Sequence, residues 1–313
     1  MNFLQIVKRD LLFYRRNNLA TLLLAMVCCA VLTGALLVGD SVRYSLLRLS
    51  QMRLGKVQFV CSTGEGYFRR ELADELANGS GSVVAPVLAL KGILESPDGT
   101  VRVNQLNIYG IDETFWQLAS GQQAMDLSAD QILPNQSLAD RLGGYTGELL
   151  LRLGTDTVLS QDLIFSTEGA DSRAWNVQVG TGVSDDLLGR FSLQAQQRLP
   201  LNVFVPIEWL ADKAQVTGKA NMLLVGHDGS GKTGPKEYDR LLRQFAILSD
   251  YGLEIRDIKE QNVIELRSPD IFLEKAVTET AIAIGANASG IFTYFVNELS
   301  SGEKSVPYST VAA

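Results

Sequence analysis

The chain has 313 residues, of which 46% are hydrophobic and 20% are charged, and this composition excludes a disordered or collagen-like protein. Its 28 basic and 35 acidic side chains give a net charge of −7, which excludes nucleic-acid binding driven by phosphate neutralisation. The three cysteines, Cys28, Cys29 and Cys61, and the single histidine, His227, do not make a usual four-ligand zinc site or a disulfide framework. We therefore expect no metal and no cofactor.

The stretch 19–39 contains no charged side chain over 21 residues. As a helix rising 1.5 Å per residue it is about 30 Å long, which matches the hydrocarbon core of a bilayer. A helix of a soluble protein is rarely apolar on every face over that length. The apolar run is longer than the core of a signal peptide, and its 18-residue leader is also long. The sequence therefore predicts an uncleaved membrane helix at 19–39.

The leader, residues 1–18, is basic, with one acidic side chain, Asp10. Positive charge beside a membrane helix favours the cytoplasmic side, so we expect the leader in the cytoplasm and the rest of the chain outside. Apolar residues at helical spacing predict an amphipathic helix on the inner surface of the lipid bilayer, although the leader could instead simply extend the membrane helix. The residues that set this topology are Lys8, Arg9, Arg15 and Arg16.

Beyond residue 39 the chain is acidic, with 24 basic and 34 acidic side chains and a net charge of −10. Residues 40–55 continue the helical pattern as a stalk, which Gly55 should end. Residues 56–313 form the outer domain. It begins with a predicted strand at 56–61 and a helix at 66–79, followed by strands at 83–96 and 100–111 around the turn Pro97-Asp98-Gly99. This order predicts an α+β unit in which a helix packs on a sheet.

Residues 112–220 form a predicted β-rich insertion, which makes the outer domain a two-part, mixed α+β structure. The strands expected there are 148–153, 162–166, 175–179 and 201–206, and the helices are 133–144 and 207–215. The remaining predicted elements are strand 221–225, helix 236–252, strands 253–258 and 263–268, helix 269–288, strand 292–299 and one last strand in the tail.

One motif resembles a phosphate-binding loop. The segment from Gly226 to Thr233 fits G-x-x-x-x-G-K-[ST], with its second glycine at Gly231 and its lysine at Lys232. In such a site the backbone amides and Lys232 would hold phosphates, and Thr233 would hold Mg²⁺. An extracytoplasmic location, Pro235 in the first turn of the next helix and the lack of a second metal-binding motif all weigh against nucleotide binding. We interpret the motif as a coincidental glycine-rich loop.

The sequence contains no other pattern that indicates catalysis. No nucleophile, base and orienting acid can be assembled around His227, and the acidic residues are scattered over predicted helix surfaces and turns. The three tryptophans, Trp116, Trp175 and Trp209, are expected in the core, and Cys61 is expected to be a half-buried apolar residue. We therefore do not expect an enzyme and name no catalytic residue.

Residues 35–59, ALLVGDSVRYSLLRLSQMRLGKVQF, resemble the start of an FtsX/MacB-type ABC transporter permease. In that family G-D-S-V-R, a leucine-rich stalk and R-L-G follow the first membrane helix. The stretches 86–112, 202–210 and 294–313 are also similar to members of the family. The resemblance implies a protein of the bacterial inner membrane with a MacB-like extracytoplasmic core domain after the stalk.

The resemblance also implies a mechanism and partners. A separate cytoplasmic ABC ATPase subunit would bind nucleotide, and its closure would move the outer domain through the stalk. A second permease chain would complete the transporter, and the exported substrate is unknown. Family members carry at least three further membrane helices, and no later stretch of this sequence is apolar for long enough. The chain is therefore expected to be either an N-terminal piece of a longer permease, which we favour, or a single-span relative. The alternatives are a nucleotide-binding protein that uses residues 226–233 and a single-pass sensor or scaffold.

Overall fold

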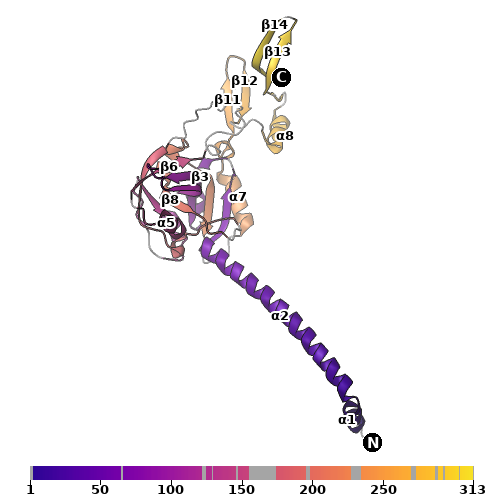
Figure 1. Ribbon diagram of the computed structural model, residues 1–313. Helices are drawn as coiled ribbons and strands as arrows, with labels where there is room; N and C mark the ends of the chain where they lie inside the picture. The colour runs from indigo at the N-terminus through magenta and orange to yellow at the C-terminus, as the bar shows by residue number, and fades with distance from the viewer. Residues whose placement is uncertain are drawn as a thin grey trace.

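The computed structural model describes a mixed α+β chain with a long apolar N-terminal helix and a β-rich domain (Figure 1). The first of its two N-terminal helices is α1, Phe3–Phe13, and the second is α2, Arg15–Leu54. The described residues are 3–64, 66–121, 125–128, 130–145, 147–154, 174–194, 198–226, 234–268, 273–285, 288–291, 293–302 and 304–312.

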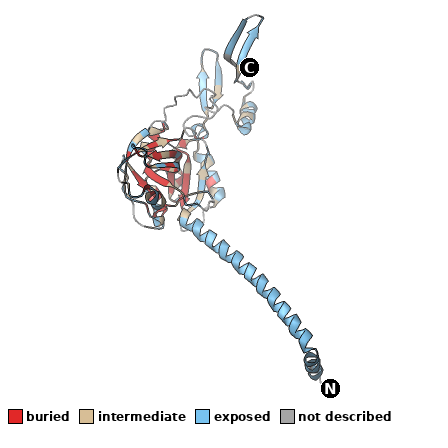
Figure 2. Ribbon diagram, viewed as in Figure 1, coloured by how far each residue is buried: buried red, intermediate tan, exposed pale blue. Residues whose placement is uncertain are grey.

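Helix α2 runs for 40 residues, about 60 Å at 1.5 Å per residue, which is roughly twice the thickness of a bilayer core. It joins the apolar run and the predicted stalk in one helix and ends at Leu54, with Gly55 as its cap. None of its residues is buried, as Figure 2 shows along its whole length. Within the described part of the chain, α2 is the one helix long and apolar enough to cross a membrane.

An eight-stranded mixed sheet forms the centre of the outer domain, in the order β1-β10-β3-β4-β8-β5-β7-β6. Strand β6 also pairs with β3, so the strands from β3 to β6 close into a ring. The long β3 makes this possible, because its first half pairs with β10 and its second half with β6. The strands of this sheet are β1 (Val57–Ser62), β3 (Val84–Glu95), β4 (Arg102–Ile111), β5 (Gln131–Pro134), β6 (Glu148–Leu153), β7 (Ala174–Val179), β8 (Asn202–Pro206) and β10 (Met222–Gly226).

Two clusters of buried apolar side chains pack on opposite faces of the sheet, since successive residues of a strand point to opposite sides. In β8, Val203 and Val205 belong to the first cluster and Phe204 to the second. The first cluster includes residues of helices α3 (Leu72–Ser80), α5 (Gln136–Leu142), α6 (Ile207–Lys213) and α7 (Pro235–Phe245). The second includes Phe115 and Trp116 of the short helix α4 (Glu113–Gln117), and the end of α2 packs against it.

Several predicted elements are confirmed. Strands β3 and β4 form the expected hairpin around residues 97–99. The helix predicted at 133–144 is α5, which begins after Asn135, whose side chain accepts a hydrogen bond from the Leu138 amide, and ends at Gly143. Near the C-terminus, β11 (Glu254–Ile258) pairs with β12 (Val263–Arg267), and β13 (Thr293–Ser301) pairs with β14 (Lys304–Ala312).

Other elements differ in their bounds. The predicted helix 66–79 begins only at Leu72, because Phe68 and Arg69 form strand β2 (Phe68–Arg69) and pair with β9 (Lys219–Ala220). The predicted helix 236–252 ends at Phe245 and is followed by a 3-10 turn, η3 (Leu248–Tyr251). The predicted helix 269–288 is shorter, α8 (Lys275–Ile284). Strand β5 was not among the predicted strands, and the predicted strand 162–166 lies outside the described residues.

The C-terminal hairpins and α8 lie away from the eight-stranded sheet (Figure 1). Among the residues after Asp250 whose side-chain exposure the structure describes, none is buried. The apolar core of the described chain is therefore built before residue 251, and α2 is attached to that core.

Candidate functional site

The end of α2 meets the outer domain at a tight joint, which we call the junction and define by Leu54, Gly55, Lys56, Leu118 and Leu188. Leu54 is half-buried and packs against the second core cluster. Gly55 has φ +55° and ψ −121°, a conformation that residues with a side chain rarely adopt. Its amide donates to the carbonyl of Gln51 at 2.9 Å, which completes the last turn of the helix.

The junction leaves no room for a side chain at Gly55. A Cβ atom there would lie 2.6 Å from the carbonyl oxygen of Leu118 and 2.8 Å from Cδ2 of Leu188. The same Leu118 oxygen accepts a hydrogen bond from the Lys56 amide at 2.8 Å, and Nζ of Lys56 donates to the carbonyl of Gln117 at 3.3 Å. The chain therefore passes from helix to sheet without a flexible linker.

Leu118 also connects the junction to the end of β10. Its side chain is 1% exposed and lies against Gly226, where an added Cβ would be 2.6 Å from Cδ2 of Leu118. The Gly226 amide donates to the carbonyl of Val83 at 2.8 Å, and Gly226 pairs with Val57 of β1. Packing alone thus requires a glycine at the first position of the phosphate-loop motif.

The rest of that motif, including Gly231, Lys232 and Thr233, lies outside the described residues. The surrounding elements differ from those of a phosphate loop. Strand β10 pairs antiparallel with both β1 and β3, whereas phosphate loops follow a strand of a parallel βαβ unit. Helix α7 begins at Pro235, after the motif has ended, although a phosphate loop leads directly into its helix. These features favour the interpretation as a coincidental loop.

The predicted topology residues lie at the other end of α2. Lys8 and Arg9 belong to α1, and Arg15 and Arg16 open α2. All four are exposed. The membrane orientation that they indicate stays a prediction.

A polar clamp holds the chain where it leaves the core. The Asp250 side chain, which is almost fully buried, accepts from the Arg69 amide at 2.9 Å, from the Arg69 guanidinium at 3.1 Å and from the Ile247 amide at 2.9 Å. Burial opposes ionisation of Asp250, but the hydrogen bonds from Arg69 and Ile247 outweigh it and lower the pKa of this carboxyl. Glu75 also pairs with Arg69, at 3.2 Å. The clamp explains why α7 stops at Phe245: the chain must turn to bring Asp250 to Arg69.

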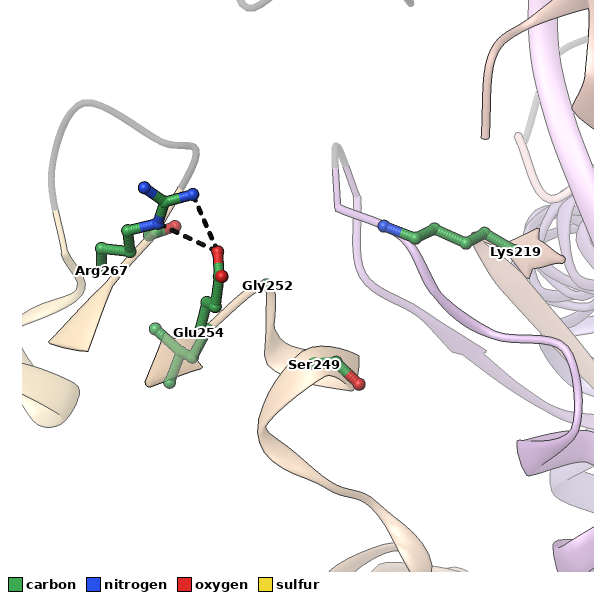
Figure 3. Close-up of a pocket in the computed structure, with 7 residues that line it drawn as sticks. Lys219, Ser249, Gly252, Glu254 and Arg267 are labelled. Atoms are coloured by element: carbon green, nitrogen blue, oxygen red, sulfur yellow. Dashed lines mark hydrogen bonds and ion pairs between the residues drawn. The ribbon is translucent and has the colours of Figure 1, made fainter. Parts of the chain in front are cut away.

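An open cavity of about 470 Å³ lies beside this clamp (Figure 3). Lys219 extends into it from β9, opposite the ion pair that Arg267 and Glu254 make at 2.9 Å, and Ser249 lines the same space. Nowhere in the described part of the chain do three His, Cys, Asp or Glu side chains gather in a way that could hold a metal ion.

The remaining candidate side chains have structural positions. Trp116 is buried, and Trp175 and Trp209 pack against the first core cluster, as predicted. Cys61 is half-buried on β1. Its burial and the nearby Asp239 carboxylate raise the pKa of the thiol, so it stays protonated.

The sequence analysis predicted that Gly55 ends the helix, but it did not predict the contact of Gly55 with Leu118. Leu118 acts through its backbone carbonyl and through one contact with Gly226, which is 108 positions away. Neither interaction has a local sequence signal, because any residue carries a carbonyl and many apolar residues could fill the space. Gly226 was the one residue of this contact that the sequence analysis singled out, as part of the loop motif, and only the fold shows that it packs against Leu118.

Comparison of the sequence with protein-family models gives no match, and comparison with curated proteins gives none either. Among solved structures, the chain is similar to the periplasmic region of MacB from Actinobacillus actinomycetemcomitans, with 12% identity and a TM-score of 0.39 over 78% of this chain and 100% of that one. It is also similar to the extracellular domain of the noncanonic ABC-type transporter YknZ from Gram-positive bacteria, with 10% identity and a TM-score of 0.37 over 64% of this chain and 90% of that one.

Proposed function

We propose that the chain is the N-terminal part of an FtsX/MacB-type ABC transporter permease. In this proposal α2 crosses the membrane with its N-terminus in the cytoplasm, and the outer domain lies on the opposite side. ATP hydrolysis by a separate ATPase subunit moves that domain, with a second permease chain beside it, to export or extract a substrate. The observation that carries the proposal is the direct attachment of an unbroken 40-residue helix to the core of the outer domain.

A helix can transmit movement only if it is stiff and fixed at its far end. Residues 40–54 extend α2 by about 22 Å beyond the apolar run. At the end of this extension, the hydrogen bonds of Lys56 to Gln117 and Leu118 fix the chain to α4. A flexible linker at this point would absorb a displacement of the helix, and the junction contains none.

The position of the sequence resemblance supports the same function. Residues 35–59 span the outer end of the apolar run, the stalk, the junction and the first residues of β1. The R-L-G of the family pattern ends at Gly55, where the backbone has positive φ and packs against Leu118. The pattern therefore coincides with the mechanical connection between helix and domain.

The orientation is tested by protease digestion of spheroplasts that contain the full chain. We expect added protease to digest the outer domain in intact spheroplasts, because the domain lies outside. If the domain is cut only after lysis, the orientation is inverted and the proposal fails.

Coupling is tested by inserting Gly-Gly-Ser-Gly between Leu54 and Gly55 in the permease assembled with its ATPase. A matched control carries the same insertion after Asp98, in the exposed turn between β3 and β4. The readout is the change that ATP produces in the protease cleavage pattern of the outer domain. We expect the junction insertion to abolish the change and the turn insertion to keep it. An unchanged ATP response in the junction variant would contradict the proposed coupling.

A further inference from the structure

Four basic side chains, two in α1 and two in the first turn of α2, outnumber the one acidic side chain of this segment. Lys8, Arg9, Arg15 and Arg16 make no ion pair within the part of the chain that the structure describes. Asp10, the acidic residue of this segment, pairs with none of them. This end of the molecule therefore carries a net positive charge that an external group could neutralise.

The break between α1 and α2 shapes a recess beside two of these charges, Arg15 and Arg16. The helix is interrupted at Tyr14, and an open space of about 280 Å³ is lined by Phe13, Tyr14, Arg15, Arg16 and Asn17. The rings of Phe13 and Tyr14 meet edge to face, with their centres 4.9 Å apart. The side chain of Asn18 donates to the carbonyl of Leu11 at 3.4 Å, which bridges the break.

The recess lies at the level of lipid headgroups if α2 spans a bilayer. Arg16 precedes the first residue of the uncharged run by three positions, about 4.5 Å along a helix axis. Aromatic side chains prefer this interface, and Phe13 and Tyr14 are both exposed. Basic side chains next to a membrane helix are attracted to the anionic lipids of the same leaflet.

We propose that this recess binds the phosphate of an anionic phospholipid. The guanidinium groups of Arg15 and Arg16 present paired N–H donors that match phosphate oxygens. Lys8 and Arg9 add attraction from α1. A zwitterionic lipid would bring a cationic amine toward the same four positive charges, so the site should prefer headgroups with net negative charge. An acidic surface of a partner protein is a competing ligand, but the exposed rings and the adjacent apolar run favour lipid.

This proposal goes beyond the transport function and does not depend on which way the chain crosses the membrane. It is tested on the full chain in neutral detergent, titrated with phosphatidylglycerol or phosphatidylcholine, with bound lipid counted by native mass spectrometry. The site variant is Arg15→Gln with Arg16→Gln. The matched control, Arg43→Gln with Arg48→Gln, removes the same charge from exposed positions of the same helix beyond the other end of the apolar run.

We expect the site variant to bind phosphatidylglycerol about 30-fold more weakly, since each basic side chain near an anionic surface contributes about a factor of five. The control should keep the affinity of the unmodified chain, Asp10→Asn should strengthen binding, and excess inorganic phosphate should not displace the lipid. Circular dichroism checks that both double variants keep their helix content.

Unchanged phosphatidylglycerol binding in the site variant would overturn the proposal, as would an equal loss of binding in the control. Displacement by inorganic phosphate would assign the recess to a free anion. If the site variant loses a co-purified protein but keeps its affinity for phosphatidylglycerol, the recess binds a protein and not a lipid.

Discussion

Replacing Gly226 with alanine tests whether this glycine serves packing or phosphate binding. The new methyl group would meet Cδ2 of Leu118 at 2.6 Å, and Leu118 is 1% exposed, so it has no free space to move into. Overpacking of this kind costs about 1–3 kcal/mol. Replacing a strand glycine recovers about 0.5–1 kcal/mol of backbone entropy. We therefore expect a net loss of about 1–2 kcal/mol, which lowers Tm by about 2–4 °C per kcal/mol in a domain of this size.

The assay is thermal unfolding of the full chain in detergent without nucleotide, followed by near-ultraviolet circular dichroism of the tryptophans. Gly290→Ala is the matched control, because a Cβ there has open space, its φ lies outside the left-handed region and it belongs to no helix or strand. It should change stability by less than about 0.5 kcal/mol. Leu118→Ala alone should cost about 2–5 kcal/mol, and adding Gly226→Ala should then cost less than in the unmodified chain, because the methyl group fills the vacated space. If Gly226→Ala is as stable as the parent chain, Leu118 does not confine this position and the packing argument is wrong.

Three further substitutions test the junction, the clamp and the phosphate-loop motif. Gly55→Ala should destabilise the domain by about 2–4 kcal/mol, since it combines unfavourable positive φ with contacts to Leu118 and Leu188, and a Tm equal to that of the parent would contradict the tight junction. Asp250→Asn should cost about 2 kcal/mol at pH 7. Because the folded pKa of Asp250 is lowered, its contribution is present above the unfolded pKa of about 3.9 and disappears as the pH falls through the folded value, so urea unfolding of this variant should vary less than the parent between pH 5 and pH 2. If the stability of this variant and of the parent chain depends on pH in the same way, the clamp does not cause the pH dependence. For the loop motif, residues 40–313 should bind fluorescent ATP only at background level, both with Lys232 and after Lys232→Ala. Saturable ATP binding that Lys232→Ala removes would instead establish a nucleotide site.

Local patterns account for the parts of the fold that the sequence predicts well. An uncharged run of 21 residues can hardly form anything except a long helix, and Pro97-Asp98-Gly99 between two apolar stretches specifies a hairpin. The cap at Asn135 is also local, because its acceptor oxygen and the Leu138 amide are three residues apart.

Long-range interactions set the elements that differ. The predicted helix 236–252 has apolar residues at helical spacing, but the clamp between Asp250 and Arg69 joins positions 181 residues apart and turns the chain at Phe245. The pairing of β2 with β9 shortens the predicted helix 66–79 in the same way. No window of the sequence contains both partners of either contact. The sequence predicts only part of the junction for the same reason. Gly55 indicates the end of a helix, but nothing near it in the sequence indicates the contact with Leu118.

Strand β3 belongs both to the closed ring and to the part of the sheet that contains β10 and β1, so it connects α2 to the ring. Strand β1 follows directly from α2 and is hydrogen-bonded within the sheet to β10, and β10 reaches the closed ring through Val84–Val87 at the start of β3. A force along the helix axis would therefore reach the ring through these backbone hydrogen bonds and through the junction, where Leu54 packs against the second core cluster and Lys56 donates to the carbonyls of Gln117 and Leu118. In the proposed function, a displacement of α2 would therefore act on the ring through these contacts, with β3 as the strand that the two parts of the sheet share.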